Sequence, residues 1–91
     1  MSNVEKATEI VYAAIDEVNN MLAEKQRIPK DPSIVLYGQN AVIPSLMLMN
    51  LVVAVEEVSE DEHEAEISIT KVFHSVKDLI DQVKDLLDEE G

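Results

Sequence analysis

The sequence has 91 residues, which suffices for one domain (residues 1–91) built around a single small core. It carries 19 Asp and Glu against 7 Lys and Arg, so its formal net charge at pH 7 is −12. This charge excludes nucleic acid as a partner, because phosphate binding requires clustered cations. The absence of cysteine excludes disulfides, thiolate metal sites and a cysteine nucleophile.

The composition favours packed helices over sheets. Hydrophobic residues make up 46% of the sequence, yet aromatic residues make up only 3% and Gly occurs twice. The longest unbroken aliphatic run, residues 51–55, is far too short to span a membrane, and the first residues lack the pattern of a signal peptide. We therefore expect a soluble, cytoplasmic monomer without membrane insertion.

The first predicted element is a helix over about residues 3–25. Its apolar residues recur at helical spacing: Val4, Ala7, Val11, Ala14, Ile15, Val18, Met21 and Leu22. Residues 27–43 contain Pro29, Pro32 and Gly38 and keep no periodicity, so they predict a long connection. A loop of this length is usually functional or held by its own apolar residues. The apolar residues expected to hold this loop to the core are Ile34, Val35, Leu36, Val42 and Ile43.

A second helix is predicted from Pro44 or Ser45 to about Val58. Its best core stripe comprises Leu48, Leu51, Val52, Val55 and Val58. Other apolar residues remain on the remaining faces, which is unusual for a helix in so small a domain. The acidic stretch over residues 59–66 predicts a solvated loop rather than a strong Ca²⁺ site, because it lacks the spaced ligands and Gly of an EF-hand.

The last part of the chain predicts an extended piece, a short helical turn and a final helix. Residues 67–69 alternate in polarity, and residues 71–73 are suited to a single helical turn. Ser75 followed by Asp78 resembles an N-terminal cap, and an apolar stripe then runs over residues 76–88. The whole pattern predicts a small antiparallel four-helix bundle with three long helices and one short one.

In its order of elements the chain resembles the acyl carrier protein family over nearly its whole length. The family motif is Asp-Ser-Leu followed by an apolar helix that ends in acidic residues. The matching residues here are Ser45 and Leu46, followed by Leu51-Val52-Val53-Ala54-Val55-Glu56-Glu57, with Leu36-Tyr37-Gly38 resembling the preceding loop.

The resemblance implies a carrier without catalytic activity of its own. A 4′-phosphopantetheine arm, added to Ser45 by a phosphopantetheinyl transferase, would hold acyl groups as thioesters for enzymes with basic or apolar docking surfaces, as in lipid and fatty acid biosynthesis. The thiol would belong to the cofactor, which accounts for the missing cysteine. Relatives in mechanism, the peptidyl and aminoacyl carriers, share the same serine chemistry.

Two positions depart from the family pattern. Pro44 stands where the family has Asp, an acid that helps the transferase recognise the serine. Met47 and Asn50 stand where acidic or polar residues are common, so the outer face of the second helix is more apolar. We expect this face to bind partner enzymes. The expected partner-binding residues are Leu46, Met47, Met49, Asn50, Val53, Glu56 and Glu57.

Three interpretations other than a carrier exist for these residues. Ser45 is also suited to be an ordinary helix-start serine. A serine hydrolase is disfavoured because Ser45 lacks a Gly-x-Ser-x-Gly setting and only His63 and His74 could act as base. The main rival is an unmodified helical interaction module that binds a partner helix with the apolar face of the second helix. No metal site is expected.

Overall fold

The computed structural model describes residues 3–22, 24, 27–38, 45–64 and 66–90. Within them the chain forms three helices, α1 (Asn3–Asn19), α2 (Ser45–His63) and α3 (Val76–Glu90). These residues form no strand; a single antiparallel bridge joins Val35 and Ser75. The radius of gyration of 12.2 Å agrees with the ~12 Å expected of a compact domain of this length.

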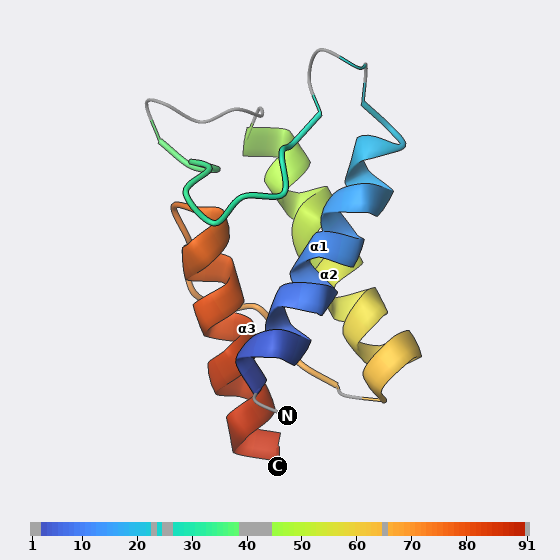
Figure 1. Cartoon of the computed structure of the whole chain (residues 1–91), viewed down its shortest axis with the longest axis vertical. Coiled ribbons are helices and arrows are strands. Elements are labelled where there is room, and N and C mark those ends of the chain that lie inside the picture. The colour runs from blue at the N-terminus through green and yellow to red at the C-terminus, as the bar shows by residue number, and fades with distance from the viewer. Residues whose placement is uncertain (1–2, 23, 25–26, 39–44, 65, 91) are drawn as a thin grey trace.

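Helix α1 lies at the centre of the arrangement. It packs against both α2 and α3, whereas α2 and α3 have little direct contact. Figure 1 shows that α2 and α3 both run in the direction opposite to α1 and diverge around it. The protein is therefore a small, compact all-α structure in which α2 and α3 run in the same chain direction.

The core is formed by the apolar stripes of the three helices. Six residues of α1 are buried, and they cover a wide arc because the helix has neighbours on two sides. Two residues that the sequence places in this stripe are exposed: Val4, in the first turn of α1, and Met21, which lies beyond the end of the helix. The buried apolar residues of the helices are Ala7, Ile10, Val11, Ala14, Ile15, Val18, Leu51, Ala54, Val55, Val58, Val76, Leu79, Ile80, Val83 and Leu87.

Helix α1 is shorter than predicted, and the connection after it is tied back to its end. The helix ends at Asn19, not near residue 25. The Asn19 side chain accepts a hydrogen bond from the Ile28 N–H (2.7 Å) and donates one to the Ile28 carbonyl (3.0 Å). Lys30 also pairs with Asp16 at 2.9 Å. These contacts and the burial of Ile28 hold the connection against α1.

Helix α2 is longer than predicted. It continues five residues beyond Val58 to His63, so the expected acidic loop over residues 59–66 is wrong for its first part. Val58 and Ser59 are buried, and the acidic residues 60–62 that follow are helical although their side chains are exposed to solvent. Glu64 ends the helix with a positive φ of 54° while its N–H still bonds to the Glu60 carbonyl.

The short helix predicted at residues 71–73 is not formed. Residues 66–74 instead make an irregular segment, here called the strap, that passes between α2 and α3. Ile67 and Phe73 of the strap are buried and belong to the same core as the helices. Backbone groups of the strap form hydrogen bonds with side chains of both helices, as described below, so these groups are satisfied without a helix.

The N-terminus of α3 is fully capped by the long connection and by Ser75. The Val76 and Lys77 N–H groups donate to the carbonyls of Ile34 and Pro32, both at 2.9 Å. The Asp78 N–H donates to Ser75 Oγ at 3.1 Å, which confirms the predicted cap. Among the described residues, no helix combines the length and apolar character that crossing a bilayer would require.

Candidate functional site

Ser45 is the first residue of α2 and thus stands at the junction of the long connection and the most apolar helix. This agrees with the position predicted for the helix start. Residues 39–44, Pro44 among them, lie outside the described part of the chain, as do the side chains of Ser45 and Leu46. The candidate site therefore comprises the described residues around this helix start.

An apolar pocket of about 240 Å³ opens beside the first turns of α2. Leu48 and Met49 stand three and four residues after Ser45, about one helical turn of ~5.4 Å along the axis. The pocket is lined by Leu48, Met49 and Val52 of α2, Val72 and Phe73 of the strap, and Tyr37. Its lining is almost entirely apolar, so water inside it is poorly bound and an aliphatic chain would be favoured.

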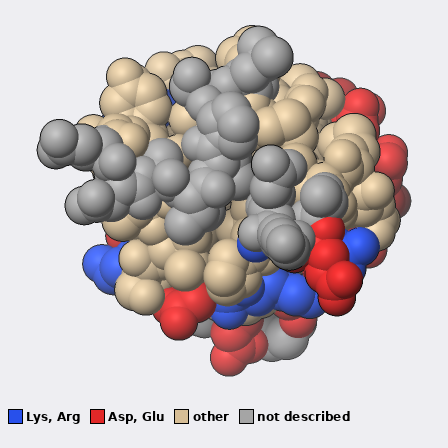
Figure 2. Space-filling view, turned by 90° about the horizontal axis from the view of Figure 1, so that it is seen from above, with Lys and Arg blue, Asp and Glu red and all other residues tan. Residues whose placement is uncertain are grey.

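Three of the lining residues form an exposed rim around this pocket. Tyr37, Met49 and Val72 have exposed fractions of 46%, 66% and 70%. Figure 2 views the end of the molecule where α2 begins, and uncharged residues make up much of its visible described surface. Sequence reasoning assigned Leu48 and Val52 to the core and did not identify Tyr37 or Val72, whose approach depends on the course of the strap.

The predicted partner-binding residues fall into two groups. Met49, Asn50, Val53 and Glu57 are exposed on α2. Met47 and Glu56, in contrast, face the body of the protein and are partly buried. Met47 packs against the core, and a carboxylate oxygen of Glu56 accepts a hydrogen bond from the Ile69 N–H at 2.8 Å. Each therefore has a structural role that the sequence did not indicate.

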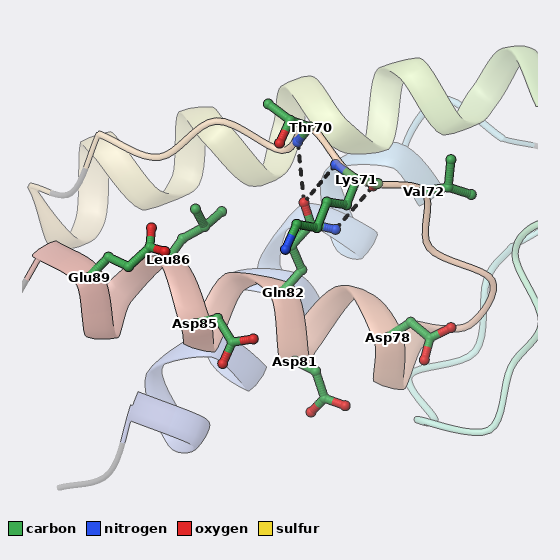
Figure 3. A pocket seen from close by; sticks show the side chains of 9 residues that line it. All are labelled: Thr70, Lys71, Val72, Asp78, Asp81, Gln82, Asp85, Leu86 and Glu89. Atoms are coloured by element: carbon green, nitrogen blue, oxygen red, sulfur yellow. Dashed lines mark hydrogen bonds between the residues drawn. The ribbon is translucent and has the colours of Figure 1, made fainter.

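A second hollow, of about 370 Å³, lies on the other side of the strap against α3. Figure 3 shows the α3 carboxylates on one side of it and the strap on the other. Its α3 wall carries four carboxylates at spacings of three or four residues: Asp78, Asp81, Asp85 and Glu89. Lys71 is the cation that lines it, and Val72 lines both hollows. The helical spacing of these acids is present in the sequence, but the hollow that they line depends on the course of the strap.

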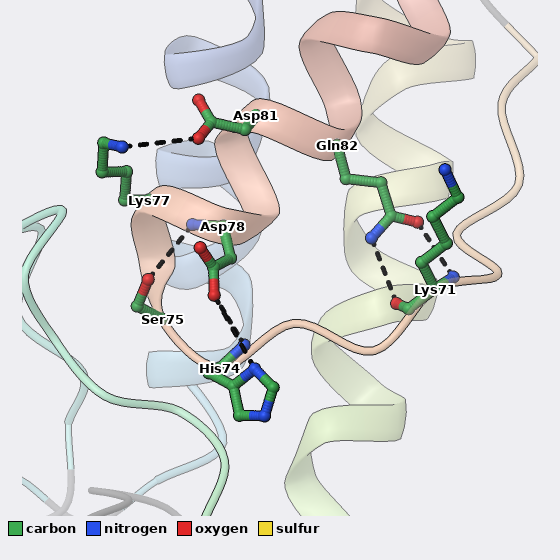
Figure 4. A network of polar contacts seen from close by, with 7 residues as sticks. All are labelled: Lys71, His74, Ser75, Lys77, Asp78, Asp81 and Gln82. Carbon is green, nitrogen blue, oxygen red and sulfur yellow. Dashed lines mark hydrogen bonds and ion pairs between the residues drawn. The ribbon is translucent and has the colours of Figure 1, made fainter.

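The strap is fixed between the two hollows by Gln82. Its Oε1 accepts hydrogen bonds from the N–H groups of Thr70 (3.2 Å) and Lys71 (3.1 Å), and its Nε2 donates to the Lys71 carbonyl (3.1 Å). At the end of the strap, the His74 N–H donates to Asp78 Oδ2 at 3.1 Å (Figure 4). These contacts set the position of Val72 between the hollows.

The histidines give little support to a hydrolytic site at Ser45. His63 ends α2, so 18 helical residues, or about 27 Å of axis, separate it from Ser45. The His74 ring is exposed and lies edge-on to Tyr37 with 5.6 Å between the ring centroids. Within the described residues, no three His, Cys, Asp or Glu side chains are grouped so that they could hold a metal ion.

Comparisons with known proteins provide no family assignment. No protein-family model matches the chain, and no curated protein or solved structure matches it either.

Proposed function

We propose that this protein is an acyl carrier whose attachment residue is Ser45. The observation that carries the proposal is the apolar pocket one helical turn from Ser45, at the start of α2. An arm attached there would have an aliphatic compartment within reach for the group it carries. Each methylene buried in such a compartment would contribute about 0.8 kcal/mol.

The chemistry of a helix start is compatible with a phosphodiester. The first turn of a helix presents N–H groups and positive dipole charge, which favour an anion. At the start of α3 the long connection and Ser75 accept hydrogen bonds from the N–H groups of Val76, Lys77 and Asp78. When bound, 4′-phosphopantetheine would supply the thiol that the chain lacks and would hold acyl groups as thioesters.

The chain's own residues would position and shelter the carried group. Leu48, Val52 and Phe73 would contact an aliphatic chain, while the exposed Met49 and Val53 would remain available to partner enzymes. The protein would not catalyse acyl transfer itself. Its partners would be a phosphopantetheinyl transferase and acyl-transferring enzymes, and the three-helix arrangement with a strap is compatible with a variant of the carrier bundle.

The proposal is tested by modification in vitro. The protein is incubated with a broad-specificity phosphopantetheinyl transferase and coenzyme A, and its intact mass and modified residue are determined. We expect one phosphopantetheine on Ser45 and none on Ser45→Ala. Pro44→Asp, which restores the family residue, should increase the rate. Failure of both the parent protein and Pro44→Asp to be modified would contradict the carrier and favour the unmodified interaction module.

A further inference from the structure

The acids that line the hollow next to the apolar rim, here called the acidic hollow, belong to α3, and Lys71 of the strap is the cation that lines it. Val72 lines both the apolar pocket and the acidic hollow, so the two hollows form one continuous surface across the strap. On α2, the exposed residues next to Met49 are the neutral Asn50 and Val53. The next acid on that exposed face, Glu57, stands eight residues after Met49, or about 12 Å along the helix.

The carboxylates on the α3 side of the acidic hollow are spaced to match the side chains of a helix lying alongside α3. Its carboxylates extend from Asp78 to Glu89, eleven residues or about 16 Å along the axis, which is about three turns of an α-helix. Lys77 pairs with Asp81 at 3.6 Å and Lys84 approaches Asp85 at 3.9 Å, but these pairs are exposed. Exposed pairs contribute little, so cations of a partner can replace them at little cost.

The surface is also held in one shape. Gln82 forms hydrogen bonds with the strap backbone at Thr70 and Lys71 and thereby holds the adjacent Val72 between the two hollows. Val72 is 70% exposed, a large apolar residue presented at the centre of the surface. A preorganised apolar centre flanked by charge is the arrangement that binding surfaces use, because little ordering is required on association.

We propose that this surface docks a basic amphipathic helix of a partner protein. The apolar side of the partner helix packs on the rim formed by Tyr37, Met49 and Val72. Its Lys and Arg residues, repeated every three or four positions, lie over the carboxylates of α3. The charge complementarity also accelerates encounter, given the net charge of −12. This docking does not depend on modification of Ser45.

The test uses the unmodified full-length protein and a synthetic 18-residue helical peptide of Leu and Lys with one apolar and one basic face. Binding is measured by fluorescence anisotropy, and the surface is mapped from amide chemical shifts. The charge variant is Asp81→Asn with Asp85→Asn and Glu89→Gln. Its matched control, Glu5→Gln with Glu9→Gln and Glu17→Gln, removes three exposed carboxylates of α1 and gives the same net charge. Urea unfolding verifies that every variant is folded.

We expect the α3 charge variant to raise the dissociation constant of the peptide at least about fivefold more than the α1 control does. Val72→Ser should raise it about threefold or more, whereas Val4→Ser, an exposed Val of α1, should not. The amides of Met49, Val72 and Asp81 should shift together. Equal weakening by the two charge variants, or shifts confined to the exposed face of α2, would overturn the proposal. Failure of Ser45 modification would leave this outcome unchanged, so the two proposals are tested separately.

Discussion

The side-chain amide of Gln82 brackets the backbone of Lys71: Oε1 accepts from the Lys71 N–H and Nε2 donates to the Lys71 carbonyl, both at 3.1 Å. The same Oε1 also accepts from the Thr70 N–H. One side chain of α3 thus satisfies three backbone groups of the strap. This explains how a segment without regular structure can separate two helices that have little contact with each other.

Removing these hydrogen bonds should loosen the strap selectively. Gln82→Met keeps the size of the side chain but leaves two N–H groups and one carbonyl without their partner. We expect the free energy of unfolding to fall by about 1–3 kcal/mol, and the amides of Thr70 and Lys71 to exchange faster with solvent. Gln82→Glu, which retains an acceptor, should lie between Met and the parent. Unchanged exchange at both amides in Gln82→Met would contradict this role.

Glu56 and Glu57 should differ in their effect on stability although they are adjacent in the sequence. Glu56 accepts the Ile69 N–H at 2.8 Å from a half-buried position, whereas Glu57 is exposed. Glu56→Ala should lower the free energy of unfolding by about 1–2 kcal/mol, because it removes a charged acceptor from a backbone donor. Glu57→Ala should change it by less than about 0.5 kcal/mol. Urea unfolding of the two variants provides the comparison, and equal values would exclude the structural role of Glu56.

The sequence predicted those features that depend on neighbouring residues. The apolar stripe of the last helix is buried as expected, and Ser75 caps that helix. The middle of the strap could not be predicted in this way, since the side chains that hydrogen-bond to its backbone at residues 69–71 are Glu56 and Gln82, more than ten residues away along the chain. An isolated reading of residues 71–73 favours a helical turn, but these tertiary contacts stabilise an irregular backbone instead.

The candidate site shows the same division between local and long-range information. The position of Ser45 at a helix start followed from the sequence. The pocket beside it did not, because it forms only where Tyr37 and Val72 approach α2 from separate segments. The extension of α2 through the acidic residues was also missed, since exposed acids leave no apolar stripe to detect.

Met47 and Val53 were both expected on the partner-binding face, and the structure now separates them. Met47 packs against the core, while Val53 is 48% exposed. Met47→Glu should therefore lower the free energy of unfolding by about 1–3 kcal/mol, because a charge would be placed against apolar groups. Val53→Glu should change it by less than about 0.5 kcal/mol. Only Val53→Glu is then suitable for testing partner binding on this face. If urea unfolding found Val53→Glu strongly destabilised, the exposed position assigned to Val53 would be contradicted.

Asp88 should make stability depend on pH in acid. Hydrogen bonds from Asn3 of α1 and from Lys84 lower the pKa of Asp88 below its ordinary value of 3.8. A carboxylate with a lowered pKa stabilises the folded state above the ordinary pKa, and this contribution is lost as pH falls through the folded value. Urea unfolding at pH 7 should thus find Asp88→Asn less stable than the parent, and the difference should narrow as the pH falls below the ordinary pKa of 3.8 and the folded carboxylate becomes protonated.

A control is required because protonation also relieves the repulsion of a chain with a net charge of −12. Asp61→Asn removes the same charge from an exposed position of α2. The difference between Asp88→Asn and Asp61→Asn at each pH therefore isolates the contacts that join the start of α1 to the end of α3. If that difference were the same at pH 7 and at about pH 2, the Asn3 and Lys84 contacts would not be the source of the acid dependence.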